Sequence, residues 1–205
     1  MAATRRARQE PLLSDQVSQR EIAIILRELQ PTLRLPGDVV EFGCYVGTTS
    51  VFLARELAAS SPHKQLYVYD SFAGLPPKTA PDASPAGLQF TPGELAATKR
   101  QFMANMARAG VPMPVITKAW FQDIQPGQLP ARISFAFLDG DYYQSIMDSL
   151  RLVWPRLTPG ARVVVDDYAS EALPGAARAV DEWLRQHPAR LQVEQSLAIL
   201  HLPTA

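Results

Sequence analysis

The chain has 205 residues, of which 47% are hydrophobic, with 20 basic and 20 acidic side chains and one cysteine. This length favours one domain with a substantial core, and a net charge of zero gives no field that would gather nucleic acid or an anionic membrane. The single Cys44 excludes an internal disulfide, and no Cys or His cluster indicates a zinc site.

The N-terminus carries Arg5, Arg6 and Arg8, but no apolar stretch of the signal-peptide kind follows them. No apolar run approaches the length needed to span a bilayer. We therefore expect a cytoplasmic protein whose single domain covers residues 1–205. Within that domain, residues 1–36 are expected to form an N-terminal helical segment.

An amphipathic helix is predicted over residues 13–29, because Ile22, Ile25, Leu26 and Leu29 share one face. Strands and helices then alternate. Strands are predicted at residues 38–42, 66–70, 114–117, 134–139 and 161–166, with helices between and after them at 49–58, 94–109, 145–157 and 175–186. This repeated pattern predicts a doubly wound parallel sheet with right-handed crossovers.

Two further strand-like runs, residues 191–195 and 197–202, are separated by almost no chain. They predict a closing hairpin that adds antiparallel strands to the sheet. The expected fold is therefore α/β, with a mostly parallel seven-stranded sheet. The Pro-rich residues 74–92 form a long irregular segment, and such a segment inside a compact domain is typical of a lid or binding loop.

Two acidic stretches follow predicted strands, one at residues 138–141 and one at 163–167. Ligands of open α/β sheets bind at the carboxyl ends of the strands, so these carboxylates can converge on one spot. Three or four carboxylates there would repel one another unless a hard cation lay between them. A solvated acidic turn is the alternative for each stretch taken alone.

After the first predicted strand comes a loop with Gly43 and Gly47 that leads into a helix. Its spacing is Gly-x-x-x-Gly, which differs from the Gly-x-Gly-x-x-Gly of dinucleotide-binding loops and weighs against a nicotinamide oxidoreductase. One close backbone approach and free amides at a helix start suit a carboxylate-bearing ligand such as S-adenosylmethionine (SAM).

The second and third predicted strands are followed by further candidate cofactor residues. Asp70 stands where an acidic side chain binds a ribose diol, although it can also be a plain turn residue. Trp120 and Phe121, with Gln122 beside them, offer aromatic faces and an amide suited to an adenine. Packing of the two aromatic rings in the core is the competing interpretation.

The motifs in residues 40–50, 69–76, 139–145 and 165–168, followed by Pro174-Gly175 and residues 178–181, occur in one order along the chain. In this set and order the sequence resembles the class I SAM-dependent methyltransferases. It is most similar to the macrocin O-methyltransferase family, whose members are metal-dependent sugar O-methyltransferases of antibiotic pathways.

The resemblance implies roles for particular residues. The methionine end of SAM would be held by the first loop, its ribose by the end of the second strand, and its adenine after the third. The implied cofactor residues are Glu41, Gly43, Tyr45, Thr48, Thr49, Asp70, Ser71, Phe121, Gln122 and Asp139. The implied Mg²⁺ ligands are Asp139, Asp166 and Asp167, and Asp141 is the implied general base.

This residue set suits methyl transfer to an alcohol. A cation chelated by a diol lowers the pKa of a hydroxyl and orients its oxygen, and Mg²⁺ prefers an all-oxygen shell. Asp141 can then take the proton. Catechol methyltransferases place a lysine base three residues after their first metal aspartate, where this chain has Tyr142. The sequence therefore favours a sugar hydroxyl as acceptor, with an aromatic vicinal diol as the second candidate.

The leading interpretation is a SAM- and Mg²⁺-dependent O-methyltransferase of a small hydroxylated acceptor, a glycosylated natural product, in secondary metabolism. The resemblance suggests a homodimer, and neither nucleic acid nor membrane is an expected partner. A SAM-binding module without catalysis is the alternative from another class, and the complete acidic set argues against it. His63, His187 and His201 are expected at the surface or at a sheet edge, and Cys44 is expected to be a small packing residue.

Overall fold

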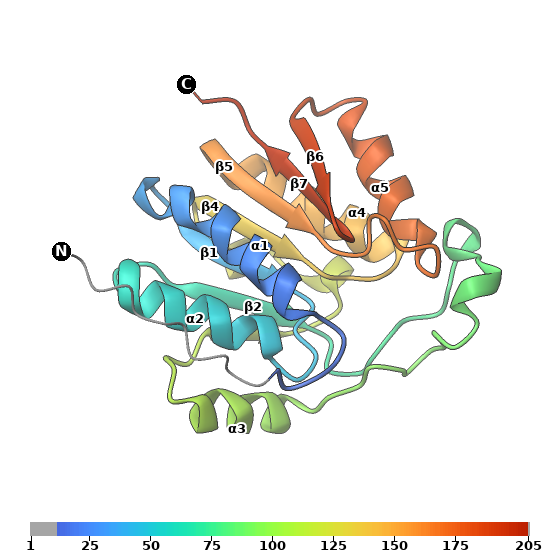
Figure 1. Cartoon of the computed structure of the whole chain (residues 1–205), viewed down its shortest axis with the longest axis horizontal. Helices are drawn as coiled ribbons and strands as arrows, with labels where there is room; N and C mark the ends of the chain where they lie inside the picture. The colour runs from blue at the N-terminus through green and yellow to red at the C-terminus, as the bar shows by residue number, and fades with distance from the viewer. Residues whose placement is uncertain (1–11, 205) are drawn as a thin grey trace.

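The computed structural model describes residues 12–204, so the basic N-terminal tail lies outside the described part of the chain. Seven strands form one sheet in the order β3-β2-β1-β4-β5-β7-β6 (Figure 1). The strands are β1 (Asp38–Phe42), β2 (Leu66–Asp70), β3 (Val115–Lys118), β4 (Ile133–Leu138), β5 (Leu157–Val165), β6 (Arg190–Glu194) and β7 (Leu197–His201). The first five pair in parallel, and β7 pairs antiparallel with both β5 and β6, which confirms the predicted sheet.

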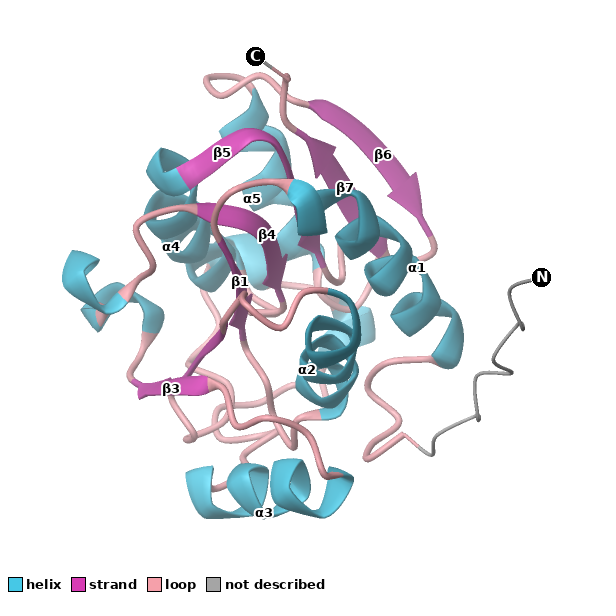
Figure 2. Cartoon of the chain, turned by 90° about the vertical axis from the view of Figure 1, so that its left-hand side faces the viewer, coloured by secondary structure: helices cyan, strands magenta, loops and turns pink. Residues whose placement is uncertain are grey.

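Helices cover both faces of this sheet (Figure 2). They are α1 (Gln19–Leu29), α2 (Thr48–Ser60), α3 (Lys99–Ala109), α4 (Tyr143–Val153) and α5 (Pro174–Leu184). Successive strand residues point to opposite faces, so Val39 and Phe135 pack with α1 and α2, whereas Val40 and Ala136 pack with α4 and α5. Nearly continuous apolar strands such as β4 are therefore buried on both sides.

The opening helix is shorter than predicted, because it begins at Gln19 instead of residue 13. Ser18 is its N-cap: the Ser18 hydroxyl accepts from the amide of Glu21, and the Glu21 carboxylate accepts from the amide of Ser18. This capping box stops the helix from extending toward the N-terminus. Residues 12–17 instead run irregularly past the start of α2, where the hydroxyls of Ser14 and Thr48 lie 3.2 Å apart.

The third helix begins at Lys99 and not at residue 94, because the hydroxyl of Thr98 caps it by accepting from the amide of Gln101. Helix α4 ends at Val153, before a short 3₁₀ turn that contains Pro155. Proline lacks the N–H that the next helical turn would need, which explains why the predicted helix to residue 157 is too long. The remaining boundaries differ from the predictions by a few residues.

The irregular segment that follows β2 extends to residue 98 and contains two 3₁₀ turns, Ala80–Asp82 and Pro85–Gly87. Figure 1 shows it, in teal and green, running out beside α4 and α5 before it returns to α3. Side-chain contacts fix its outer part: the hydroxyl of Ser84 donates to the carbonyl of Glu171 at 2.6 Å, and Arg178 donates to the carbonyl of Pro81. Across residues 12–204, no helix is long and apolar enough to cross a bilayer.

Candidate functional site

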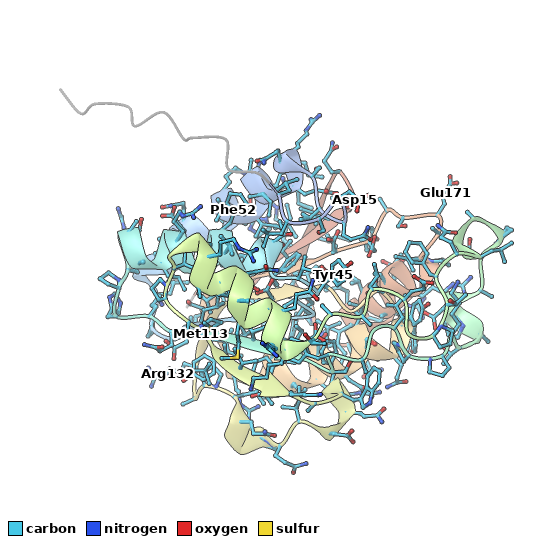
Figure 3. All side chains as sticks on the ribbon, turned by 90° about the horizontal axis from the view of Figure 1, so that it is seen from below. Asp15, Tyr45, Phe52, Met113, Arg132 and Glu171 are labelled. Carbon is cyan, nitrogen blue, oxygen red and sulfur yellow. The ribbon has the colours of Figure 1, made fainter. Side chains whose placement is uncertain are left out.

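A cavity opens at the carboxyl ends of β1, β2, β4 and β5, the edge at which α/β sheets bind ligands. It has a volume of about 140 Å³ and is open to solvent at its mouth. In Figure 3, Tyr45 lies on the same side of the molecule as Asp15 and Glu171, whereas Met113 and Arg132, which precede strands, lie on the opposite side. Of the predicted site residues, the cavity is lined by Gly43, Tyr45, Asp70, Ser71, Phe121, Asp139, Asp141, Asp166 and Asp167.

Four aspartates occupy one end of this cavity. Asp139, Asp141 and Asp167 each bring a carboxylate oxygen within 4.8 Å of the other two. Asp166 is also at the cavity, but its Oδ1 accepts from the amide of Asp167 at 2.8 Å and from the hydroxyl of Ser196 at 3.0 Å. The second oxygen of Asp166 is therefore the one that can face the cavity.

The backbone of both acidic loops is unusual in the same way. Asp141 and Asp167 each have φ of +59°, in the left-handed region that side chains rarely adopt. Aspartate is one of the few residues that tolerate this region, because its short side chain can bond locally. Tyr45, in the loop after β1, has φ of +45°. Such conformations cluster at functional sites, and here they turn each chain sharply at the sheet edge.

The aspartates hold their protons more tightly than isolated carboxyls do. Burial, with the charge of Asp166 next, raises the pKa of Asp139 and of Asp167 well above the ordinary value. The same two causes raise the pKa of Asp141 to about 7, and burial raises that of Asp166 to about 6. Four carboxylates in this position are electrostatically unfavourable together, which is the condition that a divalent cation relieves.

Gly43 allows the β1 and β4 ends to meet. A Cβ atom on Gly43 would lie 1.8 Å from the carbonyl oxygen of Asp139, and its φ of +84° is one that glycine adopts without strain. The amide of Asp139 in turn donates to the carbonyl of Phe42. Any larger residue at position 43 would push the acidic loop away from the first loop.

Asp70 fastens the loop after β1 to the end of β2. Its Oδ2 accepts from the amides of Cys44 and Tyr45 at 2.8 and 3.2 Å, and its Oδ1 accepts from the amide of Phe72 at 2.7 Å. Asp70 is therefore more than a plain turn residue, since it shapes the first loop while remaining on the cavity wall. A carboxylate can accept about four hydrogen bonds, so capacity remains for a ligand hydroxyl.

Four residues implied for the cofactor do not line the cavity, namely Gln122, described below, and three buried residues near the start of α2. Glu41 is 1% exposed and faces α2, where the hydroxyl of Ser50 donates to its Oε2. Thr48 and Thr49 are buried in the first turn of α2. Burial raises the pKa of Glu41 to about 8, so its carboxyl is largely neutral at pH 7.

This raised pKa makes the stability contribution of Glu41 depend on pH. The folded-state pKa lies above the value in the unfolded chain, so stability is fully present below about pH 4.5 and is lost as the pH rises to about 8. We expect Glu41→Gln, which removes the titration, to gain stability relative to the native chain by up to about 1.4 kcal/mol per pH unit across that interval. Urea unfolding at pH 5, 6.5 and 8 measures this difference.

The matched control for this measurement is Glu56→Gln, because Glu56 lies on α2, the helix that Glu41 faces, is more exposed than Glu41 and accepts from Ser60 and Gln30. We expect its difference from the native chain to stay flat over the same pH range. A flat difference for Glu41→Gln as well would show that Glu41 is ionised in the folded protein.

The aromatic side of the cavity is built by the segment after β3. Phe121 lines the cavity and packs edge-on against Phe42, with ring centroids 5.2 Å apart. Trp120 also lines the cavity and is 38% exposed, so the core-packing interpretation is wrong for this residue. Gln122 is exposed and lies outside the cavity lining.

Sequence reasoning missed several residues at the cavity. Gln16, from the irregular segment before α1, lies at its wall, as do Leu75, Phe90 and Leu173, which form an apolar side. Leu75 and Phe90 lie in residues 74–92, which the sequence predicted as a lid or binding loop without singling them out, whereas no local motif marks Gln16 or Leu173. The sequence also carries no signal for Ser196, which lies in the β6–β7 turn. Its hydroxyl hydrogen-bonds to Oε1 of Glu21 at 2.6 Å and to Oδ1 of Asp166 at 3.0 Å.

Comparison with known proteins places these features in a family. The model of the macrocin O-methyltransferase (TylF) family matches residues 24–196. The 8-demethyl-8-(2,3-dimethoxy-alpha-L-rhamnosyl)-tetracenomycin-C 4'-O-methyltransferase of Streptomyces olivaceus is 36% identical over 67% of this chain and 55% of its own length. The mycinamicin III 3''-O-methyltransferase of Micromonospora griseorubida is 31% identical over 75% of this chain and 62% of its own length. The chain thus spans about three fifths of the length of these relatives.

Solved structures share the fold. The O-methyltransferase NovP superposes with a TM-score of 0.74 at 23% identity, over 91% of this chain and 79% of that protein. The calicheamicin methyltransferase CalS11 superposes with a TM-score of 0.72 at 20% identity, over 90% and 80%. With the family model matched along most of its length, the chain belongs to the macrocin O-methyltransferase family.

Proposed function

We propose that the chain is a SAM-dependent O-methyltransferase that acts with Mg²⁺ on a hydroxyl of a glycosylated natural product. One observation carries the proposal: the acidic cluster and the loop after β1 open into the same cavity. Asp139 belongs to the cluster, and its carbonyl oxygen lies against Gly43 of that loop. A methyl donor bound at that loop would then present its methyl group beside groups that activate an alcohol.

The methyl donor is proposed to bind along the β1 and β2 ends. The loop after β1, with Gly43 and Tyr45 at the cavity wall, suits the methionine end of SAM. Asp70 and Ser71 suit its ribose, and Phe121 suits its adenine. Glu41, Thr48 and Thr49 are proposed to support the loop from behind. Related folds have been solved with cofactor or with SAM, including TomG of Streptomyces achromogenes, at 19% identity and a TM-score of 0.58.

Asp70→Ala should weaken SAM binding by about 1 to 3 kcal/mol, because charged hydrogen bonds to the ribose are lost and the amides of Cys44 and Tyr45 are released. Isothermal titration with SAM gives the affinity. Asp123→Ala is the control, since Asp123 is an exposed acidic residue outside the cavity lining. Equal affinity of both variants and the native chain would contradict the ribose assignment.

The acidic residues fit Mg²⁺. The donors are all oxygens, and those of Asp139, Asp141 and Asp167 lie within 4.8 Å of one another. Burial raises the pKa of each of these three carboxyls, a condition that a counter-charge relieves. We propose that Asp139, Asp166 and Asp167 hold the ion, with Asp166 oriented by Ser196. When bound, Mg²⁺ supplies Lewis acidity that lowers the pKa of an acceptor hydroxyl and a template that orients a diol.

The protein's own groups perform the remaining steps. Asp141 is proposed to accept the hydroxyl proton, because its carboxylate lies in the cavity beside the proposed ion ligands Asp139 and Asp167. The acceptor oxygen forms a bond to the methyl carbon as the sulfur–carbon bond breaks, and the sulfur keeps the electron pair. Access of water to this region would be limited by apolar side chains that line the cavity: Trp120, Phe121, and Leu75, Phe90 and Leu95 of the irregular segment after β2.

Two observations support a sugar-bearing acceptor: the names of the relatives and the apolar lining of the cavity. The names of the two curated relatives describe methylation at the 4' and 3'' positions in rhamnosyl tetracenomycin C and in mycinamicin III. Another solved structure of CalS11 is described as a TDP-rhamnose 3'-O-methyltransferase. The apolar side of the cavity, with Leu75, Phe90 and Leu173, would favour a deoxysugar or an aglycone over a fully hydroxylated sugar.

A panel of acceptors tests the proposal, with methyl transfer from SAM followed by mass spectrometry. We expect methylation of TDP-rhamnose or of p-nitrophenyl α-L-rhamnoside, and little or none of catechol. Methylation of catechol alone would favour an aromatic diol instead. SAM binding without transfer to any of the three would favour a binding module, against which the complete acidic cluster argues.

A further inference from the structure

We propose that Asp82 is a positioning residue, which fixes residues 74–95 of the irregular segment after β2 as the acceptor-side wall of the cavity by capping α4 and packing against the start of α5. The proposal builds on the function proposed above, because it assigns the acceptor to that wall. Asp82 lies in the 3₁₀ turn Ala80–Asp82 and is 1% exposed, although it belongs to a loop. It is not among the residues that line the cavity.

Both oxygens of Asp82 accept hydrogen bonds. Oδ1 accepts from the amide of Tyr143 at 2.7 Å, and Oδ2 accepts from the amide and the hydroxyl of Thr79 at 2.9 and 2.6 Å. Tyr143 is the first residue of α4, and Tyr142 at the N-cap provides no side-chain cap of its own. The carboxylate of Asp82 therefore replaces the missing cap and meets the positive end of the helix dipole.

The same oxygen lies against the start of α5. A Cβ atom on Gly175, the second residue of that helix, would be 1.9 Å from Oδ1 of Asp82 and 2.6 Å from the amide of Tyr143. The N-cap of α5, Leu173, also provides no side-chain cap. Gly175 thus leaves the space in which one loop carboxylate meets two helix starts.

These two helices follow the two acidic loops directly. Helix α4 begins two residues after Asp141, and α5 begins seven residues after Asp167. Asp82 consequently ties the loop to the same chain segments that carry the cluster. A second hydrogen bond joins the same two parts of the chain, because the hydroxyl of Tyr142 donates to the carbonyl of Phe90 at 3.1 Å.

The wall that results is apolar and lines the same cavity as the acidic cluster. Leu75, Phe90 and Leu95 come from the anchored segment, and Leu173 comes from the segment before α5. Leu75, Tyr142 and Leu173 form a small core of their own, separate from the two cores on the sheet faces. Because this core is small, the position of the wall depends on polar anchors, of which Asp82 is the most buried.

Asp82→Asn tests the anchor with a residue of the same shape. Each carboxylate oxygen accepts from an N–H, so either orientation of an amide brings its NH₂ group against a donor. Gly175→Ala displaces the carboxylate without changing its chemistry. Asp148→Asn is the matched control, because Asp148 lies on α4 and pairs with Arg151, away from the loop.

Hydrogen exchange followed by mass spectrometry measures how firmly Asp82 holds this segment. The full chain is used, with S-adenosylhomocysteine and Mg²⁺ present. We expect exchange in peptides covering 75–95 and the first turn of α4 to be at least tenfold faster in Asp82→Asn and Gly175→Ala. Exchange in β1 and β4 should stay unchanged, and Asp148→Asn should match the native chain. Unchanged exchange of the loop in both variants would overturn the proposal.

Binding separates positioning from a general loss of stability. By calorimetry, we expect both variants to bind p-nitrophenyl α-L-rhamnoside at least tenfold more weakly and SAM within twofold of the native chain. A loosened loop with unchanged rhamnoside affinity, or equal losses for SAM and rhamnoside, would refute the positioning role. If the native chain binds SAM but not the rhamnoside, the proposed acceptor is wrong, and the exchange measurement still decides whether Asp82 anchors the wall.

Discussion

Asp141→Asn should lower the rate of methyl transfer by about 10² to 10⁴ while leaving metal and SAM affinity near the native values, since this is the usual contribution of a general base. Asp139→Asn should instead lose metal affinity, because a carboxamide oxygen lacks the charge that holds a cation. The two substitutions change similar groups two residues apart in one loop, so the comparison isolates their roles.

Titration with Mn²⁺ monitored by electron paramagnetic resonance gives the metal affinity, and single-turnover transfer to the acceptor found in the panel gives the rate. Asp123→Asn, at an exposed position outside the cavity, controls for the loss of one charge. The experiment is needed because an oxygen of Asp141 lies within 4.8 Å of oxygens of both Asp139 and Asp167. Should Asp141→Asn weaken Mn²⁺ binding as much as Asp139→Asn does, Asp141 is a ligand.

In that event Tyr142 is not available as the base. Its hydroxyl donates to the carbonyl of Phe90, and burial together with the charge of Asp141 raises its pKa to about 12. The proton would then leave to solvent. Tyr142, which stands at the position of the lysine base of catechol methyltransferases, instead helps to hold residues 74–95 in place.

The sheet was predictable from the sequence because its signals are local. Apolar runs such as Ile133–Leu138 report burial on both faces, and the short gap between β6 and β7 leaves room only for a tight turn. The early start predicted for α1 failed because apolar periodicity continues through Leu13, whereas the capping box of Ser18 and Glu21 decides where the helix begins.

The candidate site was predictable to the extent that its residues follow strands. Asp70, Asp139, Asp141, Asp166 and Asp167 reach one cavity because parallel strands end at one edge. The sequence pattern could not indicate whether a side chain near a strand end points into the cavity or away from it. Glu41 was expected to contact the cofactor, but its carboxylate faces α2, where it accepts from Ser50. Nor could the pattern reveal the role of Asp82, because the α4 residue that donates to it, Tyr143, lies 61 residues further along the chain.

The acidic cluster leads to an expectation about stability without metal. Its carboxyls have higher pKa values in the folded protein than ordinary aspartates, with Asp166 at about 6 and Asp141 at about 7. As the pH rises above about 4, the unfolded chain ionises first, so stability is lost up to the folded-state pKa values. Without divalent ions, the melting temperature should therefore fall between pH 5 and pH 8.

Removal of divalent ions with EDTA should reduce methyl transfer to the level seen without enzyme, and added Mg²⁺ should restore it, because the cluster then lacks the charge that activates and orients the acceptor. The fold should survive, since the two cores on the sheet faces are formed without the cluster. By scanning fluorimetry, Mg²⁺ should raise the melting temperature more at pH 8 than at pH 5.5, because at the lower pH protons already neutralise part of the cluster. Asp139→Asn should lose most of this increase. Undiminished turnover in EDTA, with the bound metal shown to be removed by elemental analysis, would exclude the metal-dependent mechanism and leave Asp141 to activate the hydroxyl alone.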